Sequence, residues 1–520
     1  MLRILFPLLA LIFAGTAQAE WREARSKHFF VYSAGSEKSL RKATEDLEKY
    51  FFMLRFVTQV PDRPTPIPIK IYLMRNTAAV AETMGGGAGG VAGYYSASPR
   101  GPIAVGIRTD TGGEYGLSAQ EVLFHELAHH FMFQYFPAAY PPWYSEGFAD
   151  YYGSARILDK DVIEVGRPVD NRYLSFRGNN WLPVGRLLTA KSYADVSGRI
   201  DLLYSQGWLL THYLSMQKKR AGQLKQYLAA INAGVSYAEA RDRAFGKDAK
   251  ALNGELHSYA GSSRLMALSL PFKPIDVGDI ATRALTSTEE ALINYDIQLG
   301  RGIRRSEARA FGQAVENASK RFPDEPHALR LRVEAHRAAG DHAAAKTALD
   351  RWLALRPNDA LALMHRGELA IDSLANAKST DAAAWQAARA DLLAANRNAP
   401  KTPQILVAYY DSFLRRGELP PSGAQNGIMM AFDMVPQDDN LRQMVAADFE
   451  ARGMIDEAIA VITPSAVQLH AGGDPDKMKR DAERREKYRE VGDRRTETAQ
   501  EMLTRLQAAK AKGATIAAAD

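Results

Sequence analysis

Strand-like runs of apolar and aromatic residues alternate with a helical pattern at the start of the chain. Residues 28–33 and 67–74 have the composition of β-strands, and between them residues 37–57 repeat apolar side chains at the period of an amphipathic helix. Two shorter strand-like segments follow at 94–96 and 103–107. The pattern predicts a mixed sheet with a helix packed against it.

The next predicted helix has recognisable ends. Ser118 and Glu121 form the S-x-x-E pattern of a capping box, an apolar run follows them, and Pro137 closes the element. A Pro-Pro pair at 141–142 can start another helix, because proline is tolerated in the first turn. A hairpin is expected next, at residues 158–167, followed by more helical sequence.

The composition changes near residue 270. Pro271, Pro274 and Gly278 interrupt the helical pattern there. Because proline and glycine clusters break helices and strands, we expect a linker over residues 271–287.

Helical sequence rich in Ala, Arg and Leu follows, with a weak internal repeat over residues 288–470. Pro323 and Pro357 are 34 residues apart, and Gly340 with Asp341 stands where a turn between two helices belongs. The segment resembles an array of degenerate tetratricopeptide repeats, with roughly four or five helix pairs. The resemblance implies a curved solenoid whose concave side binds a peptide or protein partner. A helical bundle without a groove is the alternative.

Composition excludes some classes of function. Lys and Arg number 66 and Asp and Glu 60, so the formal net charge of +6 is small for 520 residues. No basic stripe interleaved with aromatics is present, and nucleic acid is therefore not an expected partner. The chain has no Cys, which excludes disulfides and a lipid-modified cysteine. Residues 471–520 are predicted to form a charged helix of mixed sign and a tail.

The first 19 residues have the features of a secretory signal peptide. Arg3 precedes an apolar core from Ile4 to Ala14, and Ala-Gln-Ala stands before Glu20. No later stretch approaches the roughly 20 apolar residues that a membrane-spanning helix needs. We therefore expect an exported bacterial protein, periplasmic or secreted, without a membrane span.

The stretch HELAHH, residues 125–130, carries the candidate chemistry. His125 and His129 are four residues apart, so on a helix they project from one face and can reach one metal ion. Zinc held by two histidines and one carboxylate keeps a position for water. Glu126, beside the histidines, can accept a proton from that water during attack on an amide.

The third ligand distinguishes the zinc families. The metzincin pattern requires Gly and His where the chain has Met132 and Tyr135, so it does not fit. The stretch EGFAD instead places Glu146 and Asp150 on one face of the following helix. In HELAHH and EGFAD the chain resembles the gluzincin metallopeptidases, which include thermolysin and the aminopeptidase-N-like enzymes. It is most similar to the peptidase-MA-like secreted bacterial proteins.

The resemblance implies a role for each residue of these motifs. One zinc ion per chain would be held by His125, His129 and Glu146, while Asp150 would orient a ligand histidine. Tyr204, in the stretch YSQGW, occupies the place of the tyrosine that stabilises the oxyanion in aminopeptidase-N-like enzymes. The family also has an edge strand that lies over the zinc and pairs with the substrate backbone.

We therefore expect an α+β fold with a thermolysin- or gluzincin-like catalytic domain over residues 20–270, followed by an all-α solenoid of tetratricopeptide type. The expected function is an exported zinc metallopeptidase that acts on a protein or peptide. No Gly-x-Met-Glu-Asn segment precedes HELAHH, which favours an endopeptidase over an aminopeptidase. The Gly-rich stretch 85–93 is hypothesised to be a mobile loop bordering the cleft.

Two alternatives use the same sequence. The chain can be an envelope adaptor of tetratricopeptide type whose protease-like domain is inactive. It can also be a zinc hydrolase of a non-peptide amide, such as a cell-wall linkage, because that chemistry needs the same residues.

Overall fold

The computed structural model describes residues 20–63, 65–86, 91–108, 118–168, 175, 181–191, 193–196, 199–261, 265–467 and 497–517. The predicted signal peptide, residues 87–90 of the Gly-rich stretch and most of the predicted charged helix lie outside these ranges. Within them, no helix combines the length and apolar character needed to cross a bilayer.

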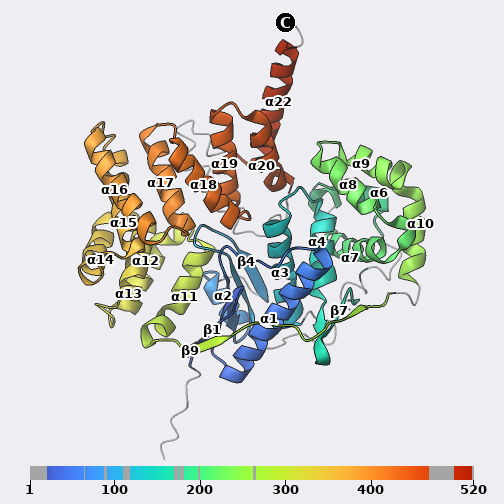
Figure 1. The fold of residues 1–520 in the computed structure, drawn as a ribbon, viewed down its shortest axis with the longest axis horizontal. Helices are drawn as coiled ribbons and strands as arrows, with labels where there is room; N and C mark the ends of the chain where they lie inside the picture. Colours follow the sequence, from blue (N-terminus) through green and yellow to red (C-terminus); the bar gives the residue numbers. More distant parts are fainter. Residues whose placement is uncertain are drawn as a thin grey trace, which may run out of the picture.

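A six-stranded mixed sheet lies at the centre of the molecule (Figure 1). Its strand order is β4–β5–β3–β2–β1–β9, with β2, β3 and β5 parallel and the other three strands antiparallel to their neighbours. The strands are β1 (Arg22–Arg25), β2 (Phe29–Ser33), β3 (Ile69–Met74), β4 (Gly93–Ser96), β5 (Ile103–Ile107) and β9 (Ala281–Ala284). The four strands expected at the start of the chain are therefore present as β2 to β5.

Alternate residues of β3 contact helices on opposite faces of the sheet. Ile69 and Ile71 enter the core formed with α1 (Glu37–Thr58) and α3 (Ala119–Tyr135). Tyr72 and Met74 enter a second core, to which α2 (Thr77–Thr83) and α11 (Ser287–Arg301) contribute. This division follows from the two-residue period of a strand. Helix α11, the first helix of the repeat region, thus packs against one face of the sheet.

The segment expected as a linker, residues 271–287, contains β9. This strand pairs antiparallel with β1, with Arg25 opposite Ala281 and Arg22 opposite Ala284. Pairing with β1 makes this segment a strand in spite of its local Pro and Gly signal. A local pattern cannot predict this pairing, because β1 is more than 250 residues away in sequence. The repeats are therefore tied to the sheet by backbone hydrogen bonds.

A small second sheet and a group of helices follow the site motifs. The sheet has the order β6–β7–β8, and β6 and β7 form the expected hairpin. Its strands are β6 (Arg156–Ile157), β7 (Val162–Val165) and β8 (Leu268–Pro271). The helices are α4 (Pro142–Gly153), α6 (Val184–Thr189), α7 (Ile200–Met216), α8 (Gln223–Asn232), α9 (Tyr237–Phe245) and α10 (Lys250–Ala260).

Residues 287–467 form five consecutive helix pairs, counted over the described part of the chain. The predicted turn is present: Gly340 has φ 75°, and the Asp341 side chain accepts a hydrogen bond from the Ala344 amide. After α11 the helices are α12 (Arg305–Ser319), α13 (Pro326–Ala338), α14 (His342–Leu355), α15 (Ala360–Asn376), α16 (Ala382–Asn398), α17 (Pro403–Arg416), α18 (Ser422–Met434), α19 (Asp439–Ala451) and α20 (Ile455–Val467).

The helix pairs form an arc that begins beside the sheet at α11 and curves round until α18 and α19 lie near α3 (Figure 1). We refer to residues 287–467 as the helical array. A further helix, α22 (Ala499–Ala517), packs against α20 through an apolar cluster. The array therefore lies against the central domain at its start and again near α18, where Gln134 of α3 donates a hydrogen bond to the Asp433 carbonyl.

Candidate metal centre

Helix α3 begins and ends where the sequence predicts. The Ser118 hydroxyl accepts a hydrogen bond from the Glu121 amide, and the Glu121 carboxylate accepts one from the Ser118 amide, which completes the capping box. Helix α4 starts with Pro142 in its first turn, also as predicted. The two helices therefore carry HELAHH and EGFAD side by side, as local sequence signals imply.

Three side chains from these helices converge on one point. His125, His129 and Glu146 each offer a ligand atom, and the three atoms lie within 4.8 Å of one another. The two Nε2 atoms are 3.2 Å apart, and Glu146 Oε2 lies 3.4 and 3.5 Å from them. Within the described residues this is the only such group of three.

The donor set and its spacing fit a zinc ion. Zinc takes imidazole nitrogen and carboxylate oxygen at about 2.0–2.2 Å in a tetrahedral arrangement. Atoms at two corners of such a tetrahedron are separated by distances like those measured among these three side chains. Glu146 and His129 are each 1% exposed, so the group is held rigidly in the protein interior.

Asp150 acts on the group through His125. Its Oδ1 lies 2.8 Å from His125 Nδ1, and it is itself buried. Burial opposes a charge on the ring, but the hydrogen bonds and charges of Asp150 and Glu146 raise the pKa of His125 to about 9. With Nδ1 donating to Asp150, Nε2 is the nitrogen that faces His129 and Glu146.

Glu126 and Tyr204 come from different helices. Glu126 is half-buried on α3, and its charge adds to burial in raising the pKa of Tyr95 on β4. Tyr204 reaches the group from α7, with its ring nearly parallel to that of His125 and the ring centroids 6.3 Å apart. The structure thus brings His125, His129, Glu146, Asp150 and Tyr204 together, with Glu126 next to His125 in the chain.

Two glycines set the distance between α4 and α7. A Cβ on Gly147 would lie 2.4 Å from the Gly207 carbonyl oxygen, and a Cβ on Gly207 would lie 2.5 Å from the Trp143 carbonyl oxygen. The helix backbones are therefore in direct contact. Because Gly147 follows Glu146 and Gly207 is one turn beyond Tyr204, the contact fixes how these two side chains face each other.

Strand β4 lies along α3 and is joined to it by a hydrogen bond. The Tyr95 hydroxyl is 2.8 Å from His130 Nδ1. Gln437, between α18 and α19, places its amide nitrogen 3.3 Å from the same atom and 2.8 Å from the Gln134 side-chain oxygen. Burial lowers the pKa of His130 to about 3. The neutral ring has one acceptor lone pair at Nδ1, and the Tyr95 hydroxyl, at 2.8 Å, is the nearer donor to it. His130 thus links α3 to β4 and to the segment that follows α18.

His212, also on α7, lies in the core. Its Nδ1 accepts a hydrogen bond from the Tyr259 hydroxyl at 2.9 Å, and its Nε2 lies 3.3 Å from the Met266 carbonyl oxygen. Burial lowers its pKa to about 4. With both ring nitrogens engaged, His212 supports packing, and Tyr204 is the better placed donor.

Sequence reasoning missed three contributors to the site: Tyr95, Gly207 and Gln437. Gly207 stands inside YSQGW, and a small residue in an otherwise apolar helix is a signal of a close helix crossing. Tyr95 lies in a predicted strand, but its partner is on α3. Gln437 is 307 residues from His130, and no local pattern predicts that contact.

No family model matches the chain, and no curated protein matches it. Solved structures with some similarity include a thermophilic TPR protein from Thermus thermophilus, with 19% identity, a TM-score of 0.30 and coverage of 38% of this chain and 98% of the other. A MamA double mutant has 19% identity, a TM-score of 0.25 and coverage of 37% and 99%. A tetratricopeptide repeat protein from Parabacteroides merdae has 13% identity, a TM-score of 0.26 and coverage of 56% and 100%.

Proposed function

We propose that this protein is a zinc-dependent peptidase whose helical array binds a protein. The observation that carries the proposal is the convergence of His125, His129 and Glu146. Asp150 is hydrogen-bonded to His125 Nδ1, the ring nitrogen that faces away from the other two side chains. A zinc ion bound there would act as a Lewis acid that activates water and polarises an amide carbonyl.

The protein's own residues would move the protons and stabilise the charge. Glu126 would accept a proton from the attacking water and then give it to the leaving amine. Tyr204 would donate a hydrogen bond to the carbonyl oxygen as negative charge develops on it. Asp150 would keep the His125 ring in one orientation and one tautomer.

An extended peptide would bind along β4. This strand pairs with β5 on one side, and within the described residues its other edge has no strand partner. An unpaired edge offers backbone donors and acceptors to a peptide in β conformation. Because β4 lies along α3 and Tyr95 is close to Glu126, such a peptide would pass over the candidate metal centre.

The first test is the metal content of the purified mature protein, measured by elemental analysis. We expect about one zinc per chain, and loss or strong weakening of binding in Glu146→Ala. Glu164→Ala, which removes a carboxylate from β7, should keep the metal. If wild type takes up no zinc even when it is supplied, the metal site is rejected.

The second test separates the general base from the ligands. Glu126→Gln should retain zinc but lose roughly 10²–10⁴-fold in the rate of hydrolysis of fluorescein-labelled casein, because it removes the base and no ligand. His129→Ala should lose both zinc and activity. Glu121→Gln, on the same helix, preserves the capping pattern and should behave as wild type. Equal turnover by Glu126→Gln and wild type would reject the assigned role.

An adaptor function is the second candidate, and the helical array favours it. Five helix pairs over residues 287–467 offer an extended inner surface of the kind that binds peptides and proteins. This function needs no zinc chemistry. A protein that holds zinc, cleaves no labelled protein and still forms a stable complex through the array would be an adaptor with a structural metal.

A further inference from the structure

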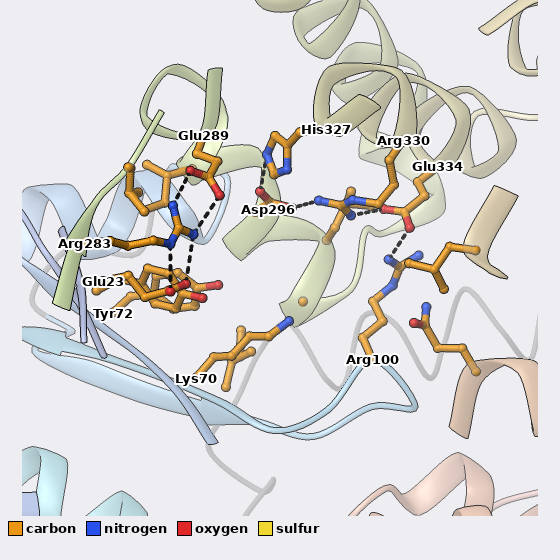
Figure 2. Close-up of a pocket in the computed structure, with 18 residues that line it drawn as sticks. Glu23, Lys70, Tyr72, Arg100, Arg283, Glu289, Asp296, His327, Arg330 and Glu334 are labelled. Carbon is orange, nitrogen blue, oxygen red and sulfur yellow. Dashed lines mark hydrogen bonds and ion pairs between the residues drawn. The ribbon is translucent and has the colours of Figure 1, made fainter. Parts of the chain in front are cut away.

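A cavity of about 280 Å³ lies between the sheet and the first helices of the array (Figure 2). Its floor is formed by β2 and β3 of the sheet, and its walls by α11 and α13, with Leu361 of α15 and Gln404 of α17 at the margin. The volume is many times what one water molecule requires. The cavity is lined by helices on the opposite face of the sheet from α3, away from the candidate metal centre.

Charged side chains line this cavity, and their charges are balanced in number. All four carboxylates have basic partners. Arg283 pairs with Glu23 at 3.0 Å and with Glu289 at 2.7 Å. The other pairs are Arg100 with Glu334 at 2.9 Å, Arg330 with Glu334 at 2.9 Å, Arg330 with Asp296, and His327 with Asp296 at 2.8 Å.

Lys70 is the exception. Its amine points from β3 into the cavity, and no interaction line reaches it in Figure 2. Among the described residues, no ion pair or hydrogen bond to this amine is found. Burial lowers its pKa, while the charge of Asp296 acts in the opposite direction. Lys70 is partly exposed, so water in the cavity can reach its amine, and a ligand carboxylate could take the place of that water.

We propose that this cavity binds a carboxylate group, with Lys70 as its principal cationic partner. Arg100 lines the same cavity and has a single carboxylate partner, Glu334, so its guanidinium retains donors for a second acceptor. The group would belong either to a small organic acid or to the C-terminus of a peptide lying along the inner side of α13, α15 and α17.

A carboxylate disturbs the charge of this cavity less than a phosphate does. Four carboxylates and four Lys or Arg side chains line the cavity, so a monoanion that pairs with Lys70 leaves one excess negative charge. A phosphate dianion would add a second negative charge beside Asp296, Glu334, Glu23 and Glu289, and those carboxylates would repel it. The site is independent of the candidate metal centre and of the peptidase proposal.

Isothermal titration calorimetry on the full mature chain tests the proposal. The probes are N-acetyl-dialanine with a free carboxylate, its C-terminal amide, and sodium acetate. We expect the dialanine acid to bind at least tenfold more tightly than the amide, because the amide carries no charge to pair with Lys70. Acetate binding as tightly as the dialanine acid identifies a small-acid site, whereas weaker acetate binding identifies a site for a peptide terminus.

Variants locate the binding. Lys70→Met keeps most of the apolar stem and should reduce the affinity for the acid at least tenfold, while Lys70→Arg should retain binding. Lys273→Met removes an exposed lysine with the same change in net charge and should have no effect. A carboxylate bound at the metal centre would be insensitive to Lys70→Met. Three results would overturn the proposal. They are equal affinity for the acid and the amide, no binding of any acid at 10 mM (roughly the weakest affinity of interest), and unchanged binding in Lys70→Met.

Discussion

His125 and His130 lie on the same helix and are both largely enclosed, yet their pKa values are shifted in opposite directions. Burial disfavours the charged ring in both. His125 faces Asp150 and Glu146, and these carboxylates outweigh burial and raise its pKa to about 9. His130 faces the neutral groups of Tyr95 and Gln437, so burial prevails and its pKa falls to about 3. The charge of the partner, rather than the depth of burial, therefore sets the direction of each pKa shift.

Asp150→Asn tests the support given to the ligand histidine. The asparagine oxygen can still accept the Nδ1 proton of His125, but the negative charge that strengthens this hydrogen bond is lost. We expect zinc affinity to fall about 10–100-fold, as for other residues that orient metal ligands. Competition with a chromophoric chelator at pH 7.5 measures the effect.

The control for Asp150→Asn is Asp324→Asn, which removes a carboxylate paired with Arg351 on the array surface. It should leave zinc affinity unchanged. If Asp150→Asn also binds zinc as wild type does, the hydrogen bond to His125 does not tune the metal site, and Asp150 contributes only to packing.

The crossing of α4 and α7 is the element contact on which the site geometry most depends. Gly207→Ala places a methyl group against the Trp143 backbone, where no flexible side chain can yield. We expect a loss of about 1–3 kcal/mol in the free energy of unfolding, as for other overpacked contacts. The helices should also separate, moving Tyr204 from His125 and lowering turnover without releasing zinc.

A second glycine provides the comparison for this change. Gly254 lies within α10, and a Cβ there meets no atom within 4 Å. Gly254→Ala should therefore stabilise the protein by about 0.5–1 kcal/mol through helix propensity. Urea unfolding of both variants measures the difference. Similar changes in the free energy of unfolding for Gly207→Ala and Gly254→Ala would show that α4 and α7 have room for a methyl group at their crossing.

Elements with local signals were predictable from the sequence. Ser118 and Glu121 define the start of α3, Pro142 starts α4, and the spacing within HELAHH and EGFAD places the candidate ligands on the correct faces. Each of these signals acts within one or two turns of helix, where residue type and conformation are directly linked.

Elements that depend on distant partners were not predictable. Strand β9 has the polar sequence ATRA and becomes a strand because β1 pairs with it. The contact of Gln437 with His130 and the cavity beneath Lys70 likewise arise only when the array folds back on the sheet. A single sequence carries no local pattern for such contacts, since tertiary pairing decides them.

At the scale of the whole molecule, the helical array is attached to the central domain in two places. At its start, α11 covers one face of the sheet, and Arg283 of β9 bridges Glu23 of β1 and Glu289 of α11. After its fourth helix pair, Gln437 contacts His130 on the helix that carries the candidate ligands. A partner that bends the array would therefore act on both the sheet and the metal helix, which gives a physical route between the two proposed functions.

The attachment at Glu289 predicts how stability depends on pH. The hydrogen bonds from Arg283, opposed by burial, lower the pKa of Glu289 from 4.5 to about 2. A carboxyl whose pKa is lower in the folded state stabilises the fold above pH 4.5 and loses that contribution as the pH falls towards 2. Glu289→Gln keeps the capping pattern with Thr286 but removes the charge. We expect it to cost about 1–3 kcal/mol at pH 6 and almost nothing near pH 2.

Urea unfolding of wild type and Glu289→Gln at a series of pH values between 6 and 2.5 measures this dependence. The exposed Glu457 on α20 supplies the control, and Glu457→Gln should follow the wild-type profile throughout. If the array and the sheet unfold as one unit, the effect of Glu289→Gln appears in a single transition that includes the metal helix. If the array unfolds separately, only its own transition moves, and coupling between the array and the candidate metal centre is then excluded.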